Sequence, residues 1–249
     1  MASLAGKTVL VVGGSSGIGY GVAKTSLLSL ASKVIIASSS QTKVEAAVAR
    51  LKEDISKAGS TIEGTFAGEV VDAKDTKSVR ALLERVGEID HLVWTSGEGL
   101  RVGFPNLDLE ANRDAFDLKF WGALTAAQVA KIRPGGSITF TIGQTIVRPI
   151  KGWSLMTGVG GAVDSLARGL AVDLAPIRVN VVSPGAVKTE FWDTFPPEQR
   201  QNLLEHAAKT SLVQHVADAD EIAEAFLFCM KCQYITGQRI EVDGGAVLV

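Results

Sequence analysis

Near its N-terminus the chain reads Val9-Leu10-Val11-Val12-Gly13-Gly14-Ser15-Ser16-Gly17-Ile18-Gly19-Tyr20-Gly21. The largely apolar residues Thr8–Val12 predict a short buried strand of a parallel sheet, and Tyr20–Leu30 predict a helix. Between them lie glycines with G-x-x-x-G-x-G spacing. Because glycine has no Cβ and tolerates positive φ, this loop can turn sharply and approach a ligand closely. The segment therefore predicts a strand–turn–helix unit at the start of the fold.

The start of this helix suits a phosphate group, because it offers free N–H groups and the positive end of the helix dipole. We interpret the loop as the site for the diphosphate of a dinucleotide. An alternative is a glycine-rich loop that only joins a strand to a helix, since the spacing is not the commonest G-x-G-x-x-G pattern. The loop opens a β–α–β pattern, which favours the dinucleotide site.

Strand-like and helix-like segments alternate along the whole chain. Such alternation predicts an α/β fold, in which helices cover both faces of a parallel sheet and the crossovers are right-handed. No repeat, linker or low-complexity tract interrupts the pattern, so we predict one domain over residues 1–249, with an irregular substrate lid over residues 188–212. Further strands are predicted at Lys33–Ser38, Thr61–Phe66, Ile89–Thr95, Ser137–Ile142, Ile177–Ser183 and Arg239–Val242, and further helices at Gln41–Lys57, Thr76–Val86, within Asn106–Ile132, at Leu155–Leu174 and at Ala219–Met230.

The bulk composition narrows the possible partners. The 249 residues are 46% apolar and carry a formal net charge of −2, which argues against nucleic acid or an anionic membrane as a partner. No apolar run reaches the roughly 18–20 residues of a membrane span, and no secretory signal pattern is present. We expect a soluble cytoplasmic protein. Cys229 and Cys232 are expected to be reduced structural thiols, and no metal site is predicted, because no second ligand pair accompanies them.

The end of the second predicted strand indicates which dinucleotide is bound. It reads Ala37-Ser38-Ser39-Ser40 and is followed by Lys43. An acidic residue here would bind the ribose diol of NAD, but none is present. Hydroxyls and a nearby ammonium suit the 2′-phosphate of NADP instead. We therefore predict NADP(H), although the same serines would also serve as N-caps of the next helix.

The whole chain resembles the short-chain dehydrogenase/reductase family, which has a Rossmann-like, doubly wound three-layer fold around a parallel seven-stranded sheet. The glycine loop matches the family's Thr-Gly-x-x-x-Gly-x-Gly, with Val12 in place of the threonine. The family's Asn-Asn-Ala-Gly stands here as Trp94-Thr95-Ser96-Gly97. Further matches are the sixth-strand motif at residues 177–189 and the C-terminal motifs Ile235-Thr236-Gly237 and Val242-Asp243-Gly244-Gly245.

The resemblance implies which residues bind the cofactor. Asp72 stands where the family's adenine-contacting Asp falls, and the loop after the sixth strand would bind nicotinamide near Val187 and phosphate through Thr189. The predicted cofactor-binding residues are Gly13, Ser15, Ser16, Gly17, Ile18, Gly19, Ser38, Ser39, Lys43, Asp72, Ser96, Gly97, Pro184, Gly185, Val187 and Thr189.

The catalytic positions depart from the family pattern. Counting back from Ala162 without gaps places Met156 and Gly160 where the family has the Tyr and Lys of Tyr-x-x-x-Lys. The family serine falls at Gly143, and the family asparagine of the long helix falls at Lys119. Because the usual proton donor and oxyanion donor are worth about 10²–10⁴-fold and ~10²–10³-fold, we expect ordinary ketone reduction to be slow.

An iminium ion needs no proton to accept hydride, so its reduction would survive this loss. The pattern is similar to atypical relatives in fungal alkaloid pathways, which reduce an iminium with NADPH and promote a following cycloaddition; this is an analogy of fold and motif. We predict a non-standard NADP(H)-dependent oxidoreductase that acts on an activated, iminium or conjugated, ring substrate in secondary metabolism. The alternatives are a redox-neutral cyclase or pericyclase with NADP as a structural cofactor, and a non-catalytic NADP(H)-binding protein.

The predicted substrate pocket is rich in aromatic side chains, whose faces suit a polycyclic or aromatic small molecule. Lys119 is a hydrogen-bond donor or solvent-facing residue, and its charge would disfavour an iminium nearby. His206 is a candidate substitute acid or a solvated helix residue, and His91 and His215 are expected to be structural. From the family we expect a homodimer or homotetramer formed through the two long helices. The predicted pocket residues are Gln144, Thr145, Trp153, Met156, Trp192 and Phe195.

Overall fold

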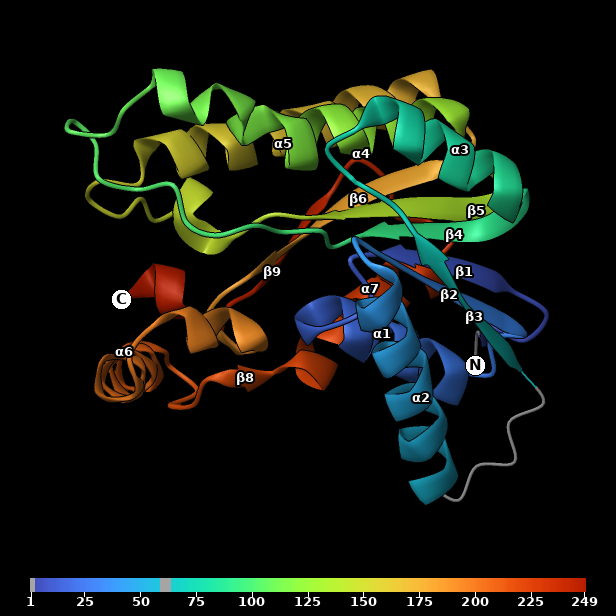
Figure 1. The fold of residues 1–249 in the computed structure, drawn as a ribbon, viewed down its shortest axis with the longest axis horizontal. Coiled ribbons are helices and arrows are strands. Elements are labelled where there is room, and N and C mark those ends of the chain that lie inside the picture. Colours follow the sequence, from blue (N-terminus) through green and yellow to red (C-terminus); the bar gives the residue numbers. More distant parts are fainter. Residues whose placement is uncertain (1–2, 59–63) are drawn as a thin grey trace.

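The computed structural model describes residues 3–58 and 64–249, and it is built around one parallel sheet (Figure 1). Every neighbouring pair of strands in this sheet runs parallel. The predicted α/β fold, a doubly wound seven-stranded sheet, is therefore confirmed. In sheet order the strands are β3 (Thr65–Val70), β2 (Lys33–Ser38), β1 (Thr8–Val12), β4 (Glu88–Trp94), β5 (Lys131–Thr141), β6 (Arg178–Pro184) and β9 (Arg239–Val242).

Helices cover both faces of the sheet. One face carries α1 (Gly17–Leu28), α2 (Gln41–Lys57) and α7 (Ala219–Lys231), at the bottom of Figure 1. The other carries α3 (Thr76–Val86), α4 (Gly122–Val129) and α5 (Ser154–Asp173), at the top. The order of the strands reverses between β1 and β4, and in such sheets ligands bind at that switch point, beyond the carboxyl ends of the strands.

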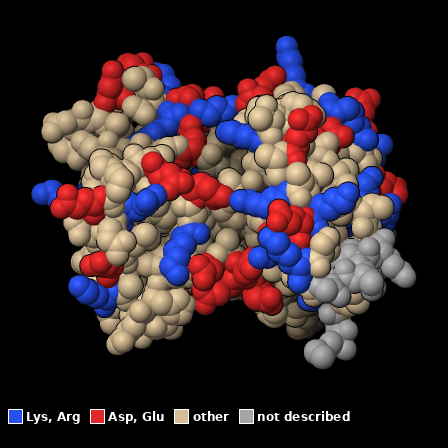
Figure 2. Space-filling model, turned by 60° about the horizontal axis from the view of Figure 1, so that its bottom comes forward, with Lys and Arg blue, Asp and Glu red and all other residues tan. Residues whose placement is uncertain are grey.

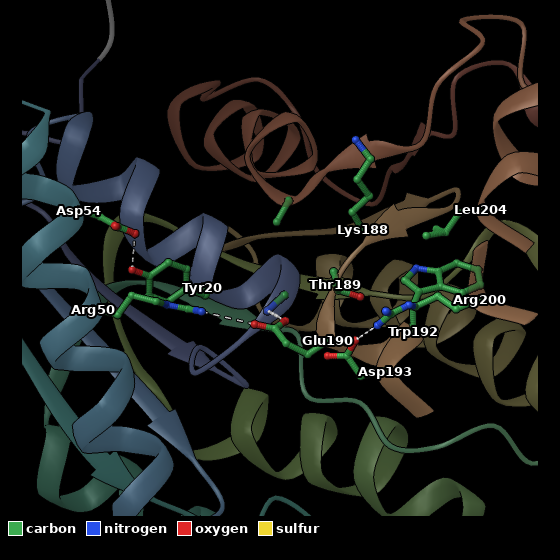
Figure 3. Close-up of a pocket in the computed structure, with 12 residues that line it drawn as sticks. Tyr20, Arg50, Asp54, Lys188, Thr189, Glu190, Trp192, Asp193, Arg200 and Leu204 are labelled. Carbon is green, nitrogen blue, oxygen red and sulfur yellow. Dashed lines mark hydrogen bonds and ion pairs between the residues drawn. The ribbon is translucent and has the colours of Figure 1, made fainter. Parts of the chain in front are cut away.

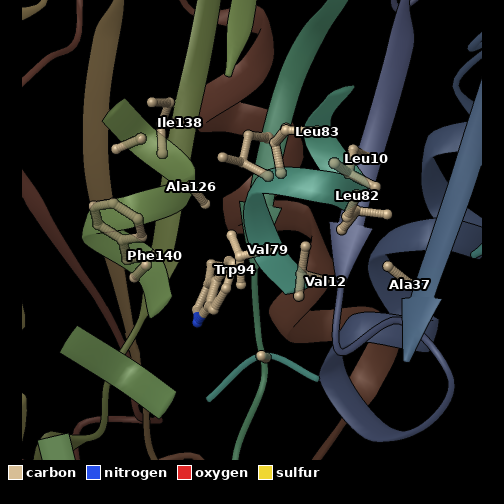
Figure 4. Close-up of a cluster of buried hydrophobic side chains, with 14 of the residues drawn as sticks. Leu10, Val12, Ala37, Val79, Leu82, Leu83, Trp94, Ala126, Ile138 and Phe140 are labelled. Atoms are coloured by element: carbon tan, nitrogen blue, oxygen red, sulfur yellow. The ribbon is translucent and has the colours of Figure 1, made fainter. Parts of the chain in front are cut away.

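The two hydrophobic cores follow from the alternation of side chains along β1. Leu10 and Val12 face the core beneath α3 and α4, which Figure 4 shows with Trp94 and Phe140 among its members. Val9 and Val11 belong to the opposite core, beneath α1 and α7. A strand that is buried on both faces reads as a continuous apolar run. This explains why the bounds of the first strand could be predicted correctly from the sequence.

Three predicted elements are clearly wrong in their bounds. The strand predicted at Ser137–Ile142 is β5, which begins at Lys131 instead. The third strand was predicted at Thr61–Phe66 but lies at Thr65–Val70, while residues 61–63 of that prediction fall outside the described residues. The helix predicted within Asn106–Ile132 is replaced by a 3-10 segment (Glu110–Phe116), a π turn (Asp117–Trp121) and the short α4. Its predicted end is a strand, because Lys131 and Ile132 pair with Glu88 and Ile89.

The lid region contains more regular structure than its sequence indicates. A 3-10 turn (Glu190–Thr194) is followed by α6 (Pro197–Thr210), which begins with a proline, a favoured residue at helix starts. Before and after them, β7 (Val187–Lys188) pairs with β8 (Ala217–Asp218). The lid thus carries one regular helix of fourteen residues, where the sequence predicted an irregular segment.

No helix among the described residues is long and apolar enough to cross a membrane. On the face shown in Figure 2, basic and acidic side chains are interspersed, and neither kind of charge covers a large continuous patch. This distribution agrees with the near-neutral net charge of the sequence.

Candidate functional site

The glycine loop follows β1 at the switch point of the sheet, and two of its glycines are sterically required. Gly13 has φ of +88°, and a Cβ there would lie 2.5 Å from the backbone nitrogen of Ser96. A Cβ on Gly19 would lie 2.3 Å from the carbonyl oxygen of Gly13. Real Cβ atoms do not approach backbone so closely, so only glycine lets the loop, the start of α1 and the segment after β4 pack together.

A groove of about 660 Å³ extends from this loop across the carboxyl ends of β1, β2 and β4. It adjoins a second cavity, and the two share lining residues such as Ile18, Gly97 and Thr189. Pro184, Gly185 and Val187 line only the second cavity. The remaining predicted cofactor-binding residues line the groove: Gly13, Ser15, Ser16, Gly17, Ile18, Gly19, Ser38, Ser39, Lys43, Asp72, Ser96, Gly97 and Thr189.

The serines at the end of β2 divide two roles between them. Ser40 is the N-cap of α2, and its side chain accepts a hydrogen bond from the Lys43 N–H. Ser38 is buried, and its hydroxyl lies 2.7 Å from that of Ser15 in the glycine loop. Ser39 and the Lys43 side chain remain in the lining of the groove. Helix capping therefore uses one serine and leaves the others beside the groove.

A carboxylate occupies the start of α1. The Gly17 N–H donates to Glu190 Oε2 over 2.8 Å, and Arg50 lies 3.4 Å from Glu190 Oε1, as Figure 3 shows. Arg50 also stacks over the Tyr20 ring at 3.5 Å, and the Tyr20 hydroxyl donates to Asp54. An anionic group thus already binds the N–H that a dinucleotide phosphate would use, so the chemistry of this helix start fits a phosphate.

The second cavity, of about 380 Å³, is named the substrate cavity after the predicted pocket residues in its lining, and it brings together the four residues that the sequence alignment assigned to the family's catalytic positions. Lys119, Gly143, Met156 and Gly160 all line it. Aromatic walls come from Trp153, Phe191 and Trp192, together with the predicted pocket residues Gln144 and Thr145. The Trp192 indole N–H donates to the Val187 carbonyl over 2.6 Å, which fixes this wall to β7.

The environments of these positions differ. A Cβ on Gly143 would meet nothing within 4 Å, whereas a Cβ on Gly160 would lie 2.8 Å from Ile146 Cγ2. Lys119 is half-buried, and its burial lowers the pKa of the amine, while the negative charge of Glu98 acts in the opposite direction. Ile146 therefore leaves little room for a side chain at position 160, where the family has its lysine. The amine in the lining of the cavity belongs to Lys119 instead.

Phe195 corrects one prediction. It lies outside the lining of the cavity and packs against Phe191 and Trp192, with ring centroids 6.0 Å from each. The reason is the 3-10 turn, which directs the Phe195 backbone N–H back to the Trp192 carbonyl. Phe195 therefore supports the aromatic wall from behind.

Three residues of the site, Thr141, Glu98 and Glu190, were not predicted from the sequence. Thr141 and Gln144 each bury an oxygen that has no hydrogen-bond partner in the described part of the chain, and both line the substrate cavity. Thr141 is the last residue of β5, and its position at a carboxyl strand end was a usable signal. Glu98 and Glu190 follow matched family motifs directly, but nothing in their local sequence distinguishes them from solvated acids.

The cysteines and two of the histidines considered in the sequence analysis lie outside the lining of the substrate cavity. Cys229 is buried, which raises the pKa of its thiol to about 12, and Cys232 is also free. His91 is buried and lies 2.9 Å from the Ser137 hydroxyl, while His206 is exposed on α6. In the described ranges 3–58 and 64–249, no group of three or more potential metal ligands occurs.

Comparison with known proteins agrees with this geometry. A family model described as an SDR-like Rossmann domain matches residues 1–249. The short-chain dehydrogenase/reductase fsr5 of Gibberella fujikuroi is 35% identical over 258 residues, which covers 100% of this chain and 97% of fsr5. The short-chain dehydrogenase/reductase malC of Malbranchea aurantiaca is 32% identical and covers 98% of this chain and 96% of malC.

Solved structures show the same relationship. The MalC Reductase/Diels-Alderase from Malbranchea aurantiaca superimposes with a TM-score of 0.91 at 32% identity, covering 99% of this chain and 98% of that one. A small-chain dehydrogenase in complex with NADPH has a TM-score of 0.80 at 30% identity, covering 98% and 99%. With the glycine loop, the strand order and these matches in agreement, the chain belongs to the short-chain dehydrogenase/reductase family.

Proposed function

We propose that this protein is an NADP(H)-dependent oxidoreductase of non-standard type that reduces an activated ring substrate. The observation that carries the proposal is the cavity beside the cofactor groove, which is lined by Lys119, Gly143, Met156 and Gly160, the residues that the sequence aligns with the family's catalytic positions. Among the residues that the structure describes, its lining holds no tyrosine that could pair with a lysine to protonate a carbonyl oxygen. The fitting substrate is one that is already charged or conjugated, and secondary metabolism supplies such compounds.

NADPH, when bound, supplies the hydride. The start of α1 would bind its diphosphate, and Ser15, Ser39 and Lys43 line the groove where a 2′-phosphate would be held. The preference for NADP(H) over NAD(H) rests on these hydroxyls and this ammonium, together with the absence of a carboxylate at the end of β2.

The substrate class follows from the walls of the cavity. Trp153, Phe191 and Trp192 offer aromatic faces to a polycyclic or aromatic ring. The buried oxygens of Thr141 and Gln144 have no partner among the described residues, and a bound molecule with polar groups would relieve their unmet hydrogen bonds. The proposed substrate is therefore mostly apolar, with a few polar atoms at one edge.

The test is single-turnover oxidation of NADPH with three acceptors: an N-methyl-dihydroisoquinolinium ion, the conjugated ketone benzylideneacetone, and its saturated analogue benzylacetone. We expect reduction of the activated acceptors and very slow reduction of the saturated ketone. Fast reduction of benzylacetone would contradict the proposal, because it would require a complete proton relay.

A redox-neutral cyclase is the second candidate, favoured by the likeness to a protein described as a reductase and a Diels-Alderase. Turnover of a substrate with NADP⁺ and without any redox change would select it. Tight NADP⁺ binding without turnover of any substrate would instead favour a non-catalytic NADP(H)-binding protein.

We also propose that the protein forms a symmetric homodimer or homotetramer. Trp121, next to α4, and Val172, in α5, are large apolar side chains that are 51% and 77% exposed. Burying such side chains against a second copy would be favourable. Light scattering at micromolar concentration should show an oligomer, and a monomer would contradict this proposal.

A further inference from the structure

Among the described residues that line the substrate cavity, only Glu98 and Lys119 carry an acid or amine side chain. Glu98 is already engaged, because its carboxylate lies 2.6 Å from Lys74 Nζ and accepts a hydrogen bond from Arg101 over 2.8 Å. Both cations bind the same Glu98 oxygen, Oε2, so this carboxylate is committed to ion pairs outside the proton-transfer step. This leaves Lys119 as the group that can exchange a proton with a molecule in the cavity.

The backbone around Lys119 is held in place. Lys119 lies in the π turn Asp117–Trp121, and the carbonyl of its neighbour Leu118 accepts a hydrogen bond from the Trp94 indole over 3.2 Å. Trp94 is 2% exposed and packs closely on Gly122, where a Cβ would lie 2.9 Å from its ring. Such widened helical turns occur often at functional sites. Trp94 therefore fixes the turn from which Lys119 enters the lining.

The amine itself is free to act. Lys119 has no hydrogen-bond or ion-pair partner in the described ranges 3–58 and 64–249, and burial lowers the pKa of its ammonium despite the nearby charge of Glu98. An amine with a lowered pKa transfers its proton more readily than a solvated lysine does. Position and acidity thus point to the same side chain.

Other charges on the elements packed against Lys119 have partners of their own. Asp114, in the preceding 3-10 segment, binds Lys74 and Arg101. Asp164, on α5, binds Arg168 and Arg239. The helix α4 carries no charged residue, and Asp117 shares the turn with Lys119 itself. Glu98 is therefore the charge that acts on the Lys119 amine.

We propose that Lys119 is the proton donor of this cavity, and that the substrate it serves is a conjugated carbonyl compound and not a pre-charged iminium. The inference rests on the proposed reductase function and narrows it. The substrate accepts hydride at its β-carbon, and the electron pair of the carbon–carbon double bond moves to give an enolate. The Lys119 ammonium donates a hydrogen bond to the enolate oxygen and then its proton, and water returns a proton to the amine.

Electrostatics favour this choice of substrate. An ammonium beside a developing oxyanion stabilises the transition state of enolate formation. The same ammonium raises the energy of a bound iminium, because the two positive charges repel each other. Lys119 therefore favours an acceptor that gains negative charge.

The kinetic test compares the wild type with Lys119→Met and Lys119→Arg, using NADPH and benzylideneacetone across a range of pH. The wild-type rate should fall as pH rises through the lowered pKa of Lys119, since only the ammonium donates. Lys119→Met should lose at least about 100-fold and this pH dependence. Lys119→Arg, which keeps a donor that is always charged, should retain partial activity without the alkaline decrease. Unchanged rates and an unchanged profile in Lys119→Met would overturn the proposal.

The iminium acceptor separates this inference from the function on which it rests. Lys119→Met should reduce the N-methyl-dihydroisoquinolinium ion faster than the wild type, because a neighbouring positive charge is gone. If the wild type reduces the iminium but not the conjugated ketone, the Lys119 proposal fails and the reductase survives. If neither acceptor is reduced, the reductase itself fails.

A second measurement does not depend on activity. Carbamylation by cyanate, followed for each lysine by mass spectrometry across pH, reports the pKa and the accessibility of each amine. Lys119 should become reactive at lower pH than the exposed Lys77 of α3, and a bound conjugated ketone should protect it. A Lys119 that does not react, or that titrates like Lys77, would overturn the proposal.

Discussion

Two glycines of the cofactor groove, Gly13 and Gly19, and two of the substrate half of the molecule, Gly143 and Gly161, have opposite surroundings. At Gly13 and Gly19 a Cβ would lie 2.5 Å or less from the backbone of another segment. At Gly143 and Gly161 a Cβ would meet nothing within 4 Å. The first pair is required by close packing of the chain on itself, and the second pair leaves open space that other side chains can enter.

The contrast explains which part of the protein can change. Where backbone segments are in close contact, as in the glycine loop, few substitutions fit. The spacing of the glycines in that loop can therefore be recognised in the sequence. A cavity lined by side chains and, at Gly143, by open space accepts other side chains more readily, although Ile146 limits their size at position 160. In this protein Lys119, Met156 and the two glycines at 143 and 160 stand in such a cavity.

The largest expected effect comes from filling the close contact. Gly19→Ala places a methyl group 2.3 Å from the Gly13 carbonyl oxygen, and overpacking against backbone should cost about 3 kcal/mol or more. The matched control is Gly161→Ala in the middle of α5, which should stabilise the protein by roughly 0.5–1 kcal/mol. Thermal unfolding of both variants measures the difference, and equal effects would remove the contrast.

The buried His91, which pairs with β1, should make the stability of the protein depend on pH. Burial lowers the pKa of His91 to about 4 from the usual 6.5, so the unfolded chain takes up a proton that the folded one refuses. Stability should therefore fall as pH decreases from 6.5 to about 4, by about 3 kcal/mol in total.

The measurement is chemical unfolding at a series of pH values. His91→Gln should lose this contribution to the pH dependence, whereas His206→Gln, a change on the exposed face of α6, should retain it. A His91→Gln profile identical to that of the wild type would show that another group is responsible.

Cofactor choice tests the groove at its open end. Ser39→Asp places a carboxylate in the lining where the 2′-phosphate would be held, and should weaken NADPH binding by roughly 1–3 kcal/mol while leaving NADH binding less affected. Calorimetry with both cofactors is the measurement. Equal dissociation constants of the two cofactors in the unmutated protein would contradict the preference.

The smallest effect concerns the contact between the two halves. Glu190→Ala removes the carboxylate that holds the Gly17 N–H and should tighten NADPH binding by about 1 kcal/mol, because a competing hydrogen bond is lost. Asp193→Ala is the control. Asp193 lies on the same 3-10 turn as Glu190, and its replacement breaks the ion pair with Arg200 of α6 but leaves the Gly17 N–H untouched. Equal affinity of both variants for NADPH would contradict the expectation.

The sequence predicted an element well where the local residue pattern determines its structure. It predicted an element poorly where contacts with distant parts of the chain determine that structure. The bounds of β1, β2, α2 and α3 agree with the prediction, because each combines a clear apolar pattern with a glycine or a capping residue at its end. The segment 106–132 was misread because its pattern suits a helix, while pairing of Lys131 and Ile132 with β4 draws its end into the sheet. Such pairing is invisible in the sequence of the segment itself.

The site divides in the same way. Residues of the glycine loop could be placed in the groove from their spacing alone, since close backbone contacts fix that spacing. The roles of Glu98 and Glu190 could not be placed, because each depends on partners far along the chain: Glu190 meets Gly17 and Arg50. Phe195 was misplaced because a turn of five residues decides which of three neighbouring aromatic rings reaches the cavity.

The hydrogen bond from the Gly17 N–H to Glu190 couples the cofactor groove to the wall of the substrate cavity. One N–H cannot serve both the carboxylate and a phosphate, so cofactor binding and release of Glu190 are a single event, coupled equally in both directions. Glu190 is followed directly by Phe191 and Trp192, which wall the substrate cavity. Displacement of Glu190 by a bound dinucleotide would therefore act directly on the segment that forms the aromatic wall of the substrate cavity.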